Sequence, residues 1–193
     1  MISLNLFTKC PYSGNPKTRL SPILSRDERS LITRQMIENI IIETNKLNVE
    51  KIKKNLYVYP NCSNDFFKGF KTSYQYNLLS QTGPDLISRM KNCLIHESKF
   101  ADKTILLGMD LPGFTSTILD HAIKTLENND FVLGPSTDNG FYLIGFKGIY
   151  RDVLNKNNLN IYNLKKHIIN HNLSLSLTTM LKDIDTPEDF LTI

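Results

Sequence analysis

The sequence predicts an α/β fold: a single three-layer αβα domain, residues 1–193, with a mostly parallel central sheet. Predicted strands and helices alternate along the chain, which is typical of a sheet covered by helices on both faces. The segment 104–109 is short and almost wholly apolar, as expected of a strand buried on both sides. A length of 193 residues also fits one domain.

Each element has a local signal. The predicted strands are short apolar runs that end at Pro, Gly or polar residues: 2–8, 55–59, 74–79, 104–109, 130–133 and 141–146. Ser25 and Glu28 form a capping box that predicts a long helix to about Lys46. Further helices are expected after Pro84 and over 115–127. A final helix is expected to begin at Pro187, with Thr186 as its N-cap.

The composition excludes several classes of protein. A charge of +4, from 23 basic and 19 acidic residues, suits an anionic small ligand but lacks the dense basic blocks of a nucleic-acid surface. No apolar run approaches the roughly 20 residues of a membrane span, and no signal peptide is recognisable. Three scattered cysteines indicate neither a zinc site nor a disulfide framework. We therefore expect a cytoplasmic protein with a small-molecule substrate and neither nucleic acid nor membrane as a partner.

The first candidate site is the loop Lys9–Leu20, which follows the first predicted strand. Gly14 allows backbone N–H groups to approach an anion, and Lys9, Lys17 and Arg19 can neutralise its charge. A diphosphate is the expected ligand, although the spacing is not that of a Walker A loop. The alternative is a solvated loop whose basic residues have no ligand.

Acidic residues supply a candidate metal site. Asp110 follows the apolar strand, where the loops of a parallel sheet meet. Mg²⁺ often takes one or two carboxylates together with substrate phosphates, so Asp110 is the expected ligand of Mg²⁺ or Mn²⁺. Asp183 or Asp185, near the C-terminus, could supply a second oxygen, although helix capping explains most of that segment.

Two further segments contain candidate ligand contacts. Asp138, Asn139 and Gly140 lie in a turn between two strands, where Asp138 could bind sugar hydroxyls or an acceptor. Gln81 offers both a donor and an acceptor that can read a base edge, and it lies beside Gly83. A plain turn and a plain strand-to-helix connection are the structural alternatives.

Taken in order, these motifs resemble one family. The sequence is similar to the bacterial selenodomain-associated transferase 1 group, a glycosyltransferase-like domain of unknown function with a glycosyltransferase-A fold. The resemblance rests on Lys9–Leu20, Gln81–Met90, Gly108–Pro112, Gly134–Gly145 and Asp183–Asp189, and so spans the whole chain. The same segments resemble those of molybdenum-cofactor and phospholactate guanylyltransferases.

The resemblance implies a nucleotide-diphosphosugar transferase-like fold and a role for each motif. It implies that Lys17 and Arg19 contact phosphates, Gln81 and Gly83 lie near the base, and Asp110 binds the metal, with Asp185 as a candidate second ligand. Lys9, Gly14 and Thr18 complete the expected nucleotide-binding set. The expected catalytic residues are Lys17, Arg19 and Asp110, and the acceptor or sugar is expected at residues 138–140.

Three functions remain open at this point. The leading hypothesis is transfer of a glycosyl group from a nucleotide sugar, with Mg²⁺ stabilising the diphosphate that leaves. The alternative is nucleotidyl transfer, in which a phosphorylated acceptor attacks an NTP and pyrophosphate leaves. The third is a non-catalytic domain that binds a nucleotide or a partner protein. The first two require the same cations, and the sequence does not separate them.

Overall fold

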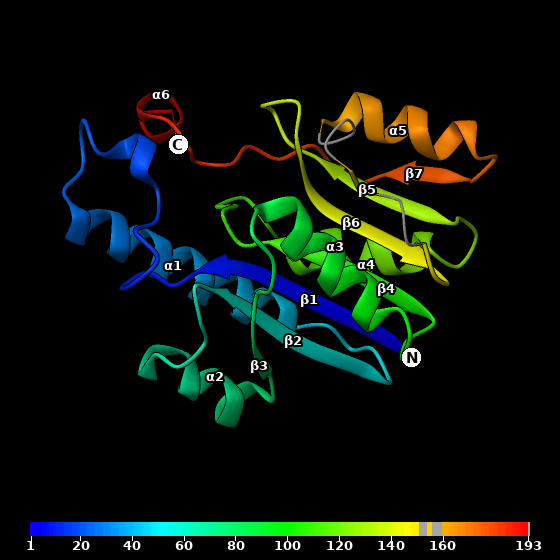
Figure 1. Cartoon of the computed structure of the whole chain (residues 1–193), viewed down its shortest axis with the longest axis horizontal. Coiled ribbons are helices and arrows are strands. Elements are labelled where there is room, and N and C mark those ends of the chain that lie inside the picture. Colours follow the sequence, from blue (N-terminus) through cyan, green and yellow to red (C-terminus); the bar gives the residue numbers. More distant parts are fainter. Residues whose placement is uncertain (151–153, 156–159, 193) are drawn as a thin grey trace.

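The computed structural model describes residues 1–150, 154–155 and 160–192 (Figure 1). The strands are β1 (Ile2–Lys9), β2 (Ile52–Tyr59), β3 (Asn77–Ser80), β4 (Lys103–Gly108), β5 (Phe131–Pro135), β6 (Phe141–Lys147) and β7 (Leu175–Leu177). The helices are α1 (Arg26–Asn45), α2 (Asp65–Tyr74), α3 (Leu86–Glu97), α4 (Ser116–Thr125), α5 (Ile161–Asn170) and α6 (Pro187–Phe190), with a 3-10 turn at Thr18–Leu20.

The strands form one sheet in the order β3-β2-β1-β4-β6-β5-β7. Strand β6 runs antiparallel to both of its neighbours, β4 and β5, and the other neighbouring pairs are parallel. The mostly parallel α/β fold predicted from the sequence is therefore confirmed. Because β1, β2 and β4 are parallel and adjacent, the loops that follow them lie along one edge of the sheet, where α/β proteins bind ligands.

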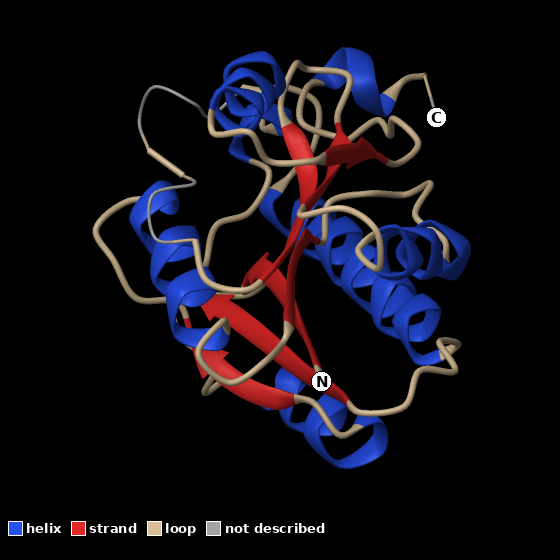
Figure 2. Cartoon of the chain, turned by 90° about the vertical axis from the view of Figure 1, so that its right-hand side faces the viewer, coloured by secondary structure: helices blue, strands red, loops and turns tan. Residues whose placement is uncertain are grey.

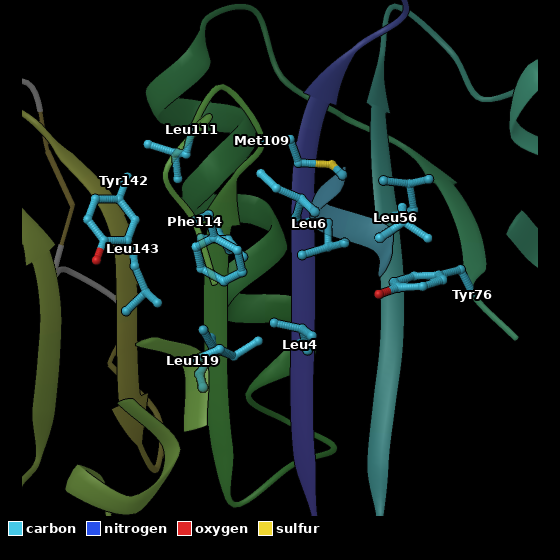
Figure 3. Close-up of a cluster of buried hydrophobic side chains, with 14 of the residues drawn as sticks. Leu4, Leu6, Leu56, Tyr76, Met109, Leu111, Phe114, Leu119, Tyr142 and Leu143 are labelled. Atoms are coloured by element: carbon cyan, nitrogen blue, oxygen red, sulfur yellow. The ribbon is translucent and has the colours of Figure 1, made fainter. Parts of the chain in front are cut away.

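Helices cover both faces of the sheet, as Figure 2 shows. One face packs against α1, α2 and α4 through a cluster that includes Leu4, Leu6, Leu56, Phe67 and Leu119 (Figure 3). The other face packs against α3 and α5 through a second cluster that includes Phe7, Tyr57, Met90, Leu106 and Leu164. The alternation along β1 assigns each residue to one face: Leu4 and Leu6 face α1, and Phe7 faces α3.

One predicted strand begins later than expected, and helix α2 and strand β7 were not predicted. The strand expected over 74–79 begins only at Asn77, because Tyr74 ends helix α2 and Gln75 adopts a left-handed conformation with φ of 59°. Helix α2 is capped by Asn64 and buries Phe67 and Phe70. Strand β7 also went unpredicted. Helix α3 begins after Pro84, as predicted, and its N-cap is Asp85, whose carboxylate accepts from the backbone N–H of Ser88 at 2.7 Å.

A polar network lies within the α3 face, away from the loops just described. The Glu97 carboxylate is fully buried and accepts hydrogen bonds from Ser3, Lys53 and Tyr57 at 2.8–2.9 Å. Burial alone would raise the pKa of Glu97, but the three hydrogen bonds outweigh it and the pKa is lowered. The carboxylate therefore stays ionised inside the core.

Membrane insertion was not expected from the sequence. None of the described helices combines the length and the apolar character that crossing a bilayer requires.

Candidate active site

The loop Lys9–Leu20 leaves the end of β1 in a tight turn. The Gly14 N–H donates to the carbonyl of Cys10 at 2.9 Å. A Cβ at position 14 would lie 2.6 Å from that carbonyl oxygen, closer than a side chain can approach. Only glycine fits this turn without a backbone shift, which is a packing reason for Gly14, and its expected contact with an anion stays a prediction.

Helix α1 holds the loop in place from the other side. Arg29 is buried and donates from Nη1 to the Pro16 carbonyl at 3.0 Å and to Asn15 Oδ1 at 3.3 Å. Ser30 donates to the Pro11 carbonyl at 2.7 Å. Sequence reasoning missed Arg29. A basic residue near the start of a helix is unfavourable, because the helix dipole is positive there. The position of Arg29 in α1 could therefore have indicated that Arg29 has a partner outside the helix.

Lys17 is the centre of the site. Its backbone is left-handed, with φ of 52° and ψ of 43°, a conformation that costs a non-glycine residue roughly 1–2 kcal/mol. Its side chain is only 3% exposed, and its ammonium lies 3.2 Å from Asp110 Oδ2 and 3.3 Å from Asp185 Oδ1. The loop therefore adopts an unfavourable backbone conformation where a lysine contacts two carboxylates.

Asp185 reaches this point because the C-terminal segment crosses the edge of the sheet. Leu181 donates its N–H to the Pro135 carbonyl and accepts from the Thr137 N–H, both at 3.1 Å, which extends β5 beyond its end. A capping box between Thr186 and Asp189 then begins α6, and the backbone N–H of Thr186 holds the pKa of Asp189 down at about 2. Asp185 also accepts from Arg19 Nη1 at 3.2 Å.

The carboxylate of Asp183 lies close to those of Asp138 and Asp185. Burial, together with the negative charges of Asp138 and Asp185, raises the pKa of Asp183. The structure thus brings Asp138 from the β5–β6 turn towards Asp183 and Asp185 from the C-terminal segment. In the sequence, Asp138 belongs to a different motif from Asp183 and Asp185.

The β5–β6 turn is held by its own hydrogen bonds. Asp138 Oδ1 accepts from Ser136 Oγ at 2.5 Å and from the Gly140 N–H at 2.9 Å. Asn139 has φ of 67°, which asparagine tolerates better than most residues. Residues 138–140 therefore form a turn that its own hydrogen bonds stabilise. A contact of these residues with an acceptor or sugar stays a prediction.

Gln81 has a structural role at the same edge. Its amide nitrogen donates to the carbonyls of Thr8 and Tyr57, both at 3.0 Å, so it joins the ends of β1 and β2. Both amide hydrogens are thereby used. Gly83, with φ of 138°, lies beyond it. A role for either residue near a nucleotide base remains a prediction.

The donor set suits a divalent cation shared with a substrate. Asp110 and Asp185 both contact one ammonium, so their carboxylates converge on a single point. Within the described ranges, no group of three or more His, Cys, Asp or Glu side chains is arranged around a metal position. Mg²⁺ and Mn²⁺ favour oxygen ligands, and two carboxylates completed by phosphates and water are a common arrangement for Mg²⁺. The residues present therefore fit such an ion when phosphates are bound.

The structure thus unites the predicted residues Lys17, Arg19, Asp110 and Asp185 in one chain of ion pairs. Lys9 and Thr18 are solvent-exposed, as a ligand contact would require. Lys9 ends β1, beside the site, and Thr18 directly follows Lys17.

A family model described as an uncharacterized protein conserved in bacteria (DUF2064) matches residues 45–160. That match covers more than half of the 193 residues. The chain belongs to the DUF2064 family. The narrower resemblance to the selenodomain-associated transferase 1 group stays a prediction.

Individual proteins are also similar to this DUF2064 chain. It is 27% identical over 195 residues to the 2-phospho-L-lactate guanylyltransferase of Methanosphaera stadtmanae, covering 95% of this chain and 81% of that protein. Among solved structures, a protein proposed to be a nucleotide-diphospho-sugar transferase, from Desulfovibrio desulfuricans G20, superposes with a TM-score of 0.85 at 24% identity, over 98% of this chain and 84% of that one.

A more distant structural relative contains a bound metal. Glucosyl-3-phosphoglycerate synthase from Mycobacterium tuberculosis, solved with Mn²⁺, UDP and glucosyl-3-phosphoglycerate, superposes with a TM-score of 0.61 at 12% identity, over 100% of this chain and 75% of that one. These structures establish that the fold is nucleotide-diphospho-sugar transferase-like.

Proposed function

We propose that the protein is a metal-dependent nucleotidyltransferase, which transfers the nucleotidyl group of an NTP to a phosphorylated acceptor and releases pyrophosphate. The observation that carries the proposal is the convergence of Lys17 and Arg19 with Asp110 and Asp185 at the carboxyl ends of the strands. The similarity to a guanylyltransferase, which covers 95% of this chain, supports nucleotidyl transfer over the other functions.

The chain's own residues account for most of the charge stabilisation. An acceptor phosphate oxygen attacks the α-phosphorus, and the bond from that phosphorus to the bridging oxygen of the β-phosphate breaks. The Lys17 ammonium, fixed by the loop and by two carboxylates, lies where it can neutralise charge that develops on the phosphoryl oxygens. Arg19, 71% exposed beyond Asp185, is free to turn towards the departing pyrophosphate.

A divalent ion complements these side chains. Asp110 and Asp185 would hold it, and when bound it supplies positive charge that stabilises the pyrophosphate as it leaves. Either Mg²⁺ or Mn²⁺ fits the oxygen ligands. Both carboxylates are part-exposed, at 53% and 39%, so a nucleotide can bring the ion to them from solvent.

Glycosyl transfer is the second candidate, favoured by the superposition on a proposed nucleotide-diphospho-sugar transferase. It would use the same phosphate and metal contacts but attack a sugar carbon instead of phosphorus. The leaving group is then a nucleoside diphosphate. The chemical identity of the product therefore separates the two candidates.

The test is a product assay. The protein is incubated with Mg²⁺ or Mn²⁺ and each of the four NTPs, with 2-phospho-L-lactate as the probe acceptor, and pyrophosphate release is measured. Parallel reactions contain UDP-glucose or GDP-mannose with the same acceptor, and nucleoside diphosphate release is measured. Asp110→Asn is the negative control.

Acceptor-dependent pyrophosphate release that Asp110→Asn abolishes would support the proposal. Nucleoside diphosphate release without pyrophosphate would replace it with glycosyl transfer. Metal-dependent nucleotide binding with no product in either reaction, across a wider panel of phosphorylated acids, would leave a non-catalytic nucleotide-binding domain.

A further inference from the structure

A second arginine lies at the same edge of the sheet, and neither the ion-pair chain nor the core accounts for it. The guanidinium carbon of Arg89, in α3, lies 4.0 Å from the ring centroid of Tyr59, which is the last residue of β2. Arg89 Nε is buried and has no hydrogen-bond partner in the described part of the chain. The guanidinium thus lies over an aromatic ring, and no described residue forms an ion pair with its terminal nitrogens, so they can bind a ligand.

The sheet register places this pair beside the candidate active site. Tyr59 of β2 pairs with Lys9 of β1, the first residue of the basic loop. Tyr57 and Phe7 face α3, so Tyr59 and Lys9, two residues further along their strands, face α3 as well. Arg89 therefore lies on the same face and the same edge as Lys9.

The spacing along the edge matches the length of a nucleotide. Strand β1 lies between β2 and β4, so Tyr59 is two strand spacings, roughly 10 Å, from the strand that leads to Asp110. A nucleotide whose phosphates contact Lys17 and Asp110 can extend past Lys9 and bring its base to Arg89. Arg34 of α1 also lies over a ring, 5.6 Å from the centroid of Phe66, but on the opposite face of the sheet.

The segment that follows Gln81 closes the other side of this position. A Cβ on Gly83 would lie 3.0 Å from the backbone nitrogen of Arg89, so this segment packs directly on the turn of α3 that carries the arginine. Asn92 Nδ2 donates to the Thr82 carbonyl at 2.9 Å and fixes the segment there. Gln81, Gly83 and Arg89 thus form one local unit.

We propose that Arg89 recognises guanine, through two hydrogen bonds from its terminal nitrogens to O6 and N7 of the base; this rests on the proposed nucleotidyl transfer. Arginine donates from two nitrogens in a fixed plane, and guanine offers two acceptors at matching separation. Adenine presents an amino group where guanine has O6, so it faces the guanidinium donor to donor. The contact with Tyr59 holds the guanidinium in place before the base arrives.

The test is calorimetric titration with Mn²⁺ and four diphosphates: GDP, IDP, 7-deaza-GDP and ADP. IDP keeps both O6 and N7, so it should bind within a few-fold of GDP. The analogue 7-deaza-GDP lacks the N7 acceptor and ADP lacks O6, so both should bind at least tenfold more weakly, which corresponds to about 1.4 kcal/mol.

Two variants assign this preference to Arg89. Arg89→Gln should weaken GDP binding at least tenfold and narrow the ratio of GDP to ADP affinity, since glutamine pairs with adenine N6 and N7. Arg89→Lys keeps the charge but loses the planar pair of donors, and should also lose the preference. His96→Gln is the matched control: His96 lies in the last turn of the same helix, in edge-to-face contact with Phe100 at a centroid distance of 5.4 Å. It should bind GDP like wild type.

Equal affinity of wild type for GDP and ADP would overturn the proposal, as would an unchanged preference in folded Arg89→Gln and Arg89→Lys. If neither variant binds any nucleotide while melting like wild type, Arg89 contacts the phosphates and the proposal is also overturned. Failure of the proposed function has a different signature: an Arg89-dependent guanine preference with no pyrophosphate release from any NTP.

Discussion

The ammonium of Lys17 lies 3.2 Å from Asp110 Oδ2, and this contact joins the loop after β1 to the loop after β4. The lysine side chain is buried whereas the carboxylate is half-exposed. The positive charge is therefore fixed by the fold, and the negative charge is accessible to solvent, as the proposed metal-bound substrate requires. Fixed charge of this kind is most effective when it need not reorganise during the reaction.

Lys17→Met should slow pyrophosphate release by on the order of 100-fold or more, because it removes the charge and keeps the length of the stem. The backbone strain at position 17 is unchanged, since methionine tolerates the left-handed conformation no better than lysine. Steady-state kinetics on the purified protein measure the effect. Lys46→Met, which removes an ion pair with Glu43 at the end of α1, is the control and should keep full activity. A Lys17→Met protein with wild-type turnover would refute the catalytic assignment.

Asp110→Asn should abolish metal-dependent nucleotide binding and leave the melting temperature nearly unchanged. Asparagine keeps the shape and one oxygen but not the charge that a divalent ion requires. Calorimetric titration of an NTP with and without Mn²⁺ measures binding, and circular dichroism measures the melting temperature. Asp120→Asn removes an exposed carboxylate paired with Lys124 in α4 and should bind like wild type. Equal metal-dependent affinity in Asp110→Asn would return Asp110 to a structural role.

Gly14→Ala should lower nucleotide affinity and protein stability together. The new Cβ would lie 2.6 Å from the Cys10 carbonyl oxygen, so the loop backbone has to move and carries Lys17 with it. Gly69→Ala is the opposite case, because nothing lies within 4 Å of its Cβ position inside α2. That variant should raise the free energy of unfolding by about 0.5–1 kcal/mol. Urea unfolding of both variants, with nucleotide titrations, measures these effects; a stabilised Gly14→Ala would contradict the packing argument.

Glu97→Gln should change how stability depends on pH. The pKa of Glu97 is lowered in the folded protein, so its ionised form contributes stability above pH 4.5, and this contribution is lost as the pH falls below that value. Melting temperatures between pH 3.5 and 7 should therefore fall less steeply at the acid end in Glu97→Gln than in wild type, from a lower starting value at pH 7. Glu50→Gln, at an exposed position, should follow the wild-type curve. If the melting temperatures of Glu97→Gln and wild type fell equally steeply at the acid end, the stabilising role of ionised Glu97 would be disproved.

Much of the fold could be predicted because its signals are local. The capping box at Ser25 and Glu28 fixes the start of α1, and the same logic at Thr186 fixes the start of α6. Helix α2 was missed because its aromatic residues are equally typical of a strand, and only packing of Phe67 and Phe70 against the sheet decides the matter. Strand β7 has three residues and depends on β5 for its hydrogen bonds.

The site was predicted in part for the same reason. Loops that follow parallel strands meet at one edge, so Lys17 and Asp110 could be expected near each other. The pairing of Lys17 with Asp185 could not, because it depends on how the C-terminal segment crosses β5. Nor could the position of Arg89 over Tyr59, because a lone arginine within a helical pattern carries no signal of what it packs against.

The Lys17–Asp185 contact joins residues separated by 168 positions. Strands β1 to β4, together with α1 to α3, pair through closer neighbours in sequence and can assemble while the later part of the chain is still being synthesised. The carboxylate at position 185 is synthesised only after all of these elements. A nascent chain therefore carries the basic loop before the acidic partner that pairs with it, and the Lys17–Asp185 contact forms later than the first half of the sheet.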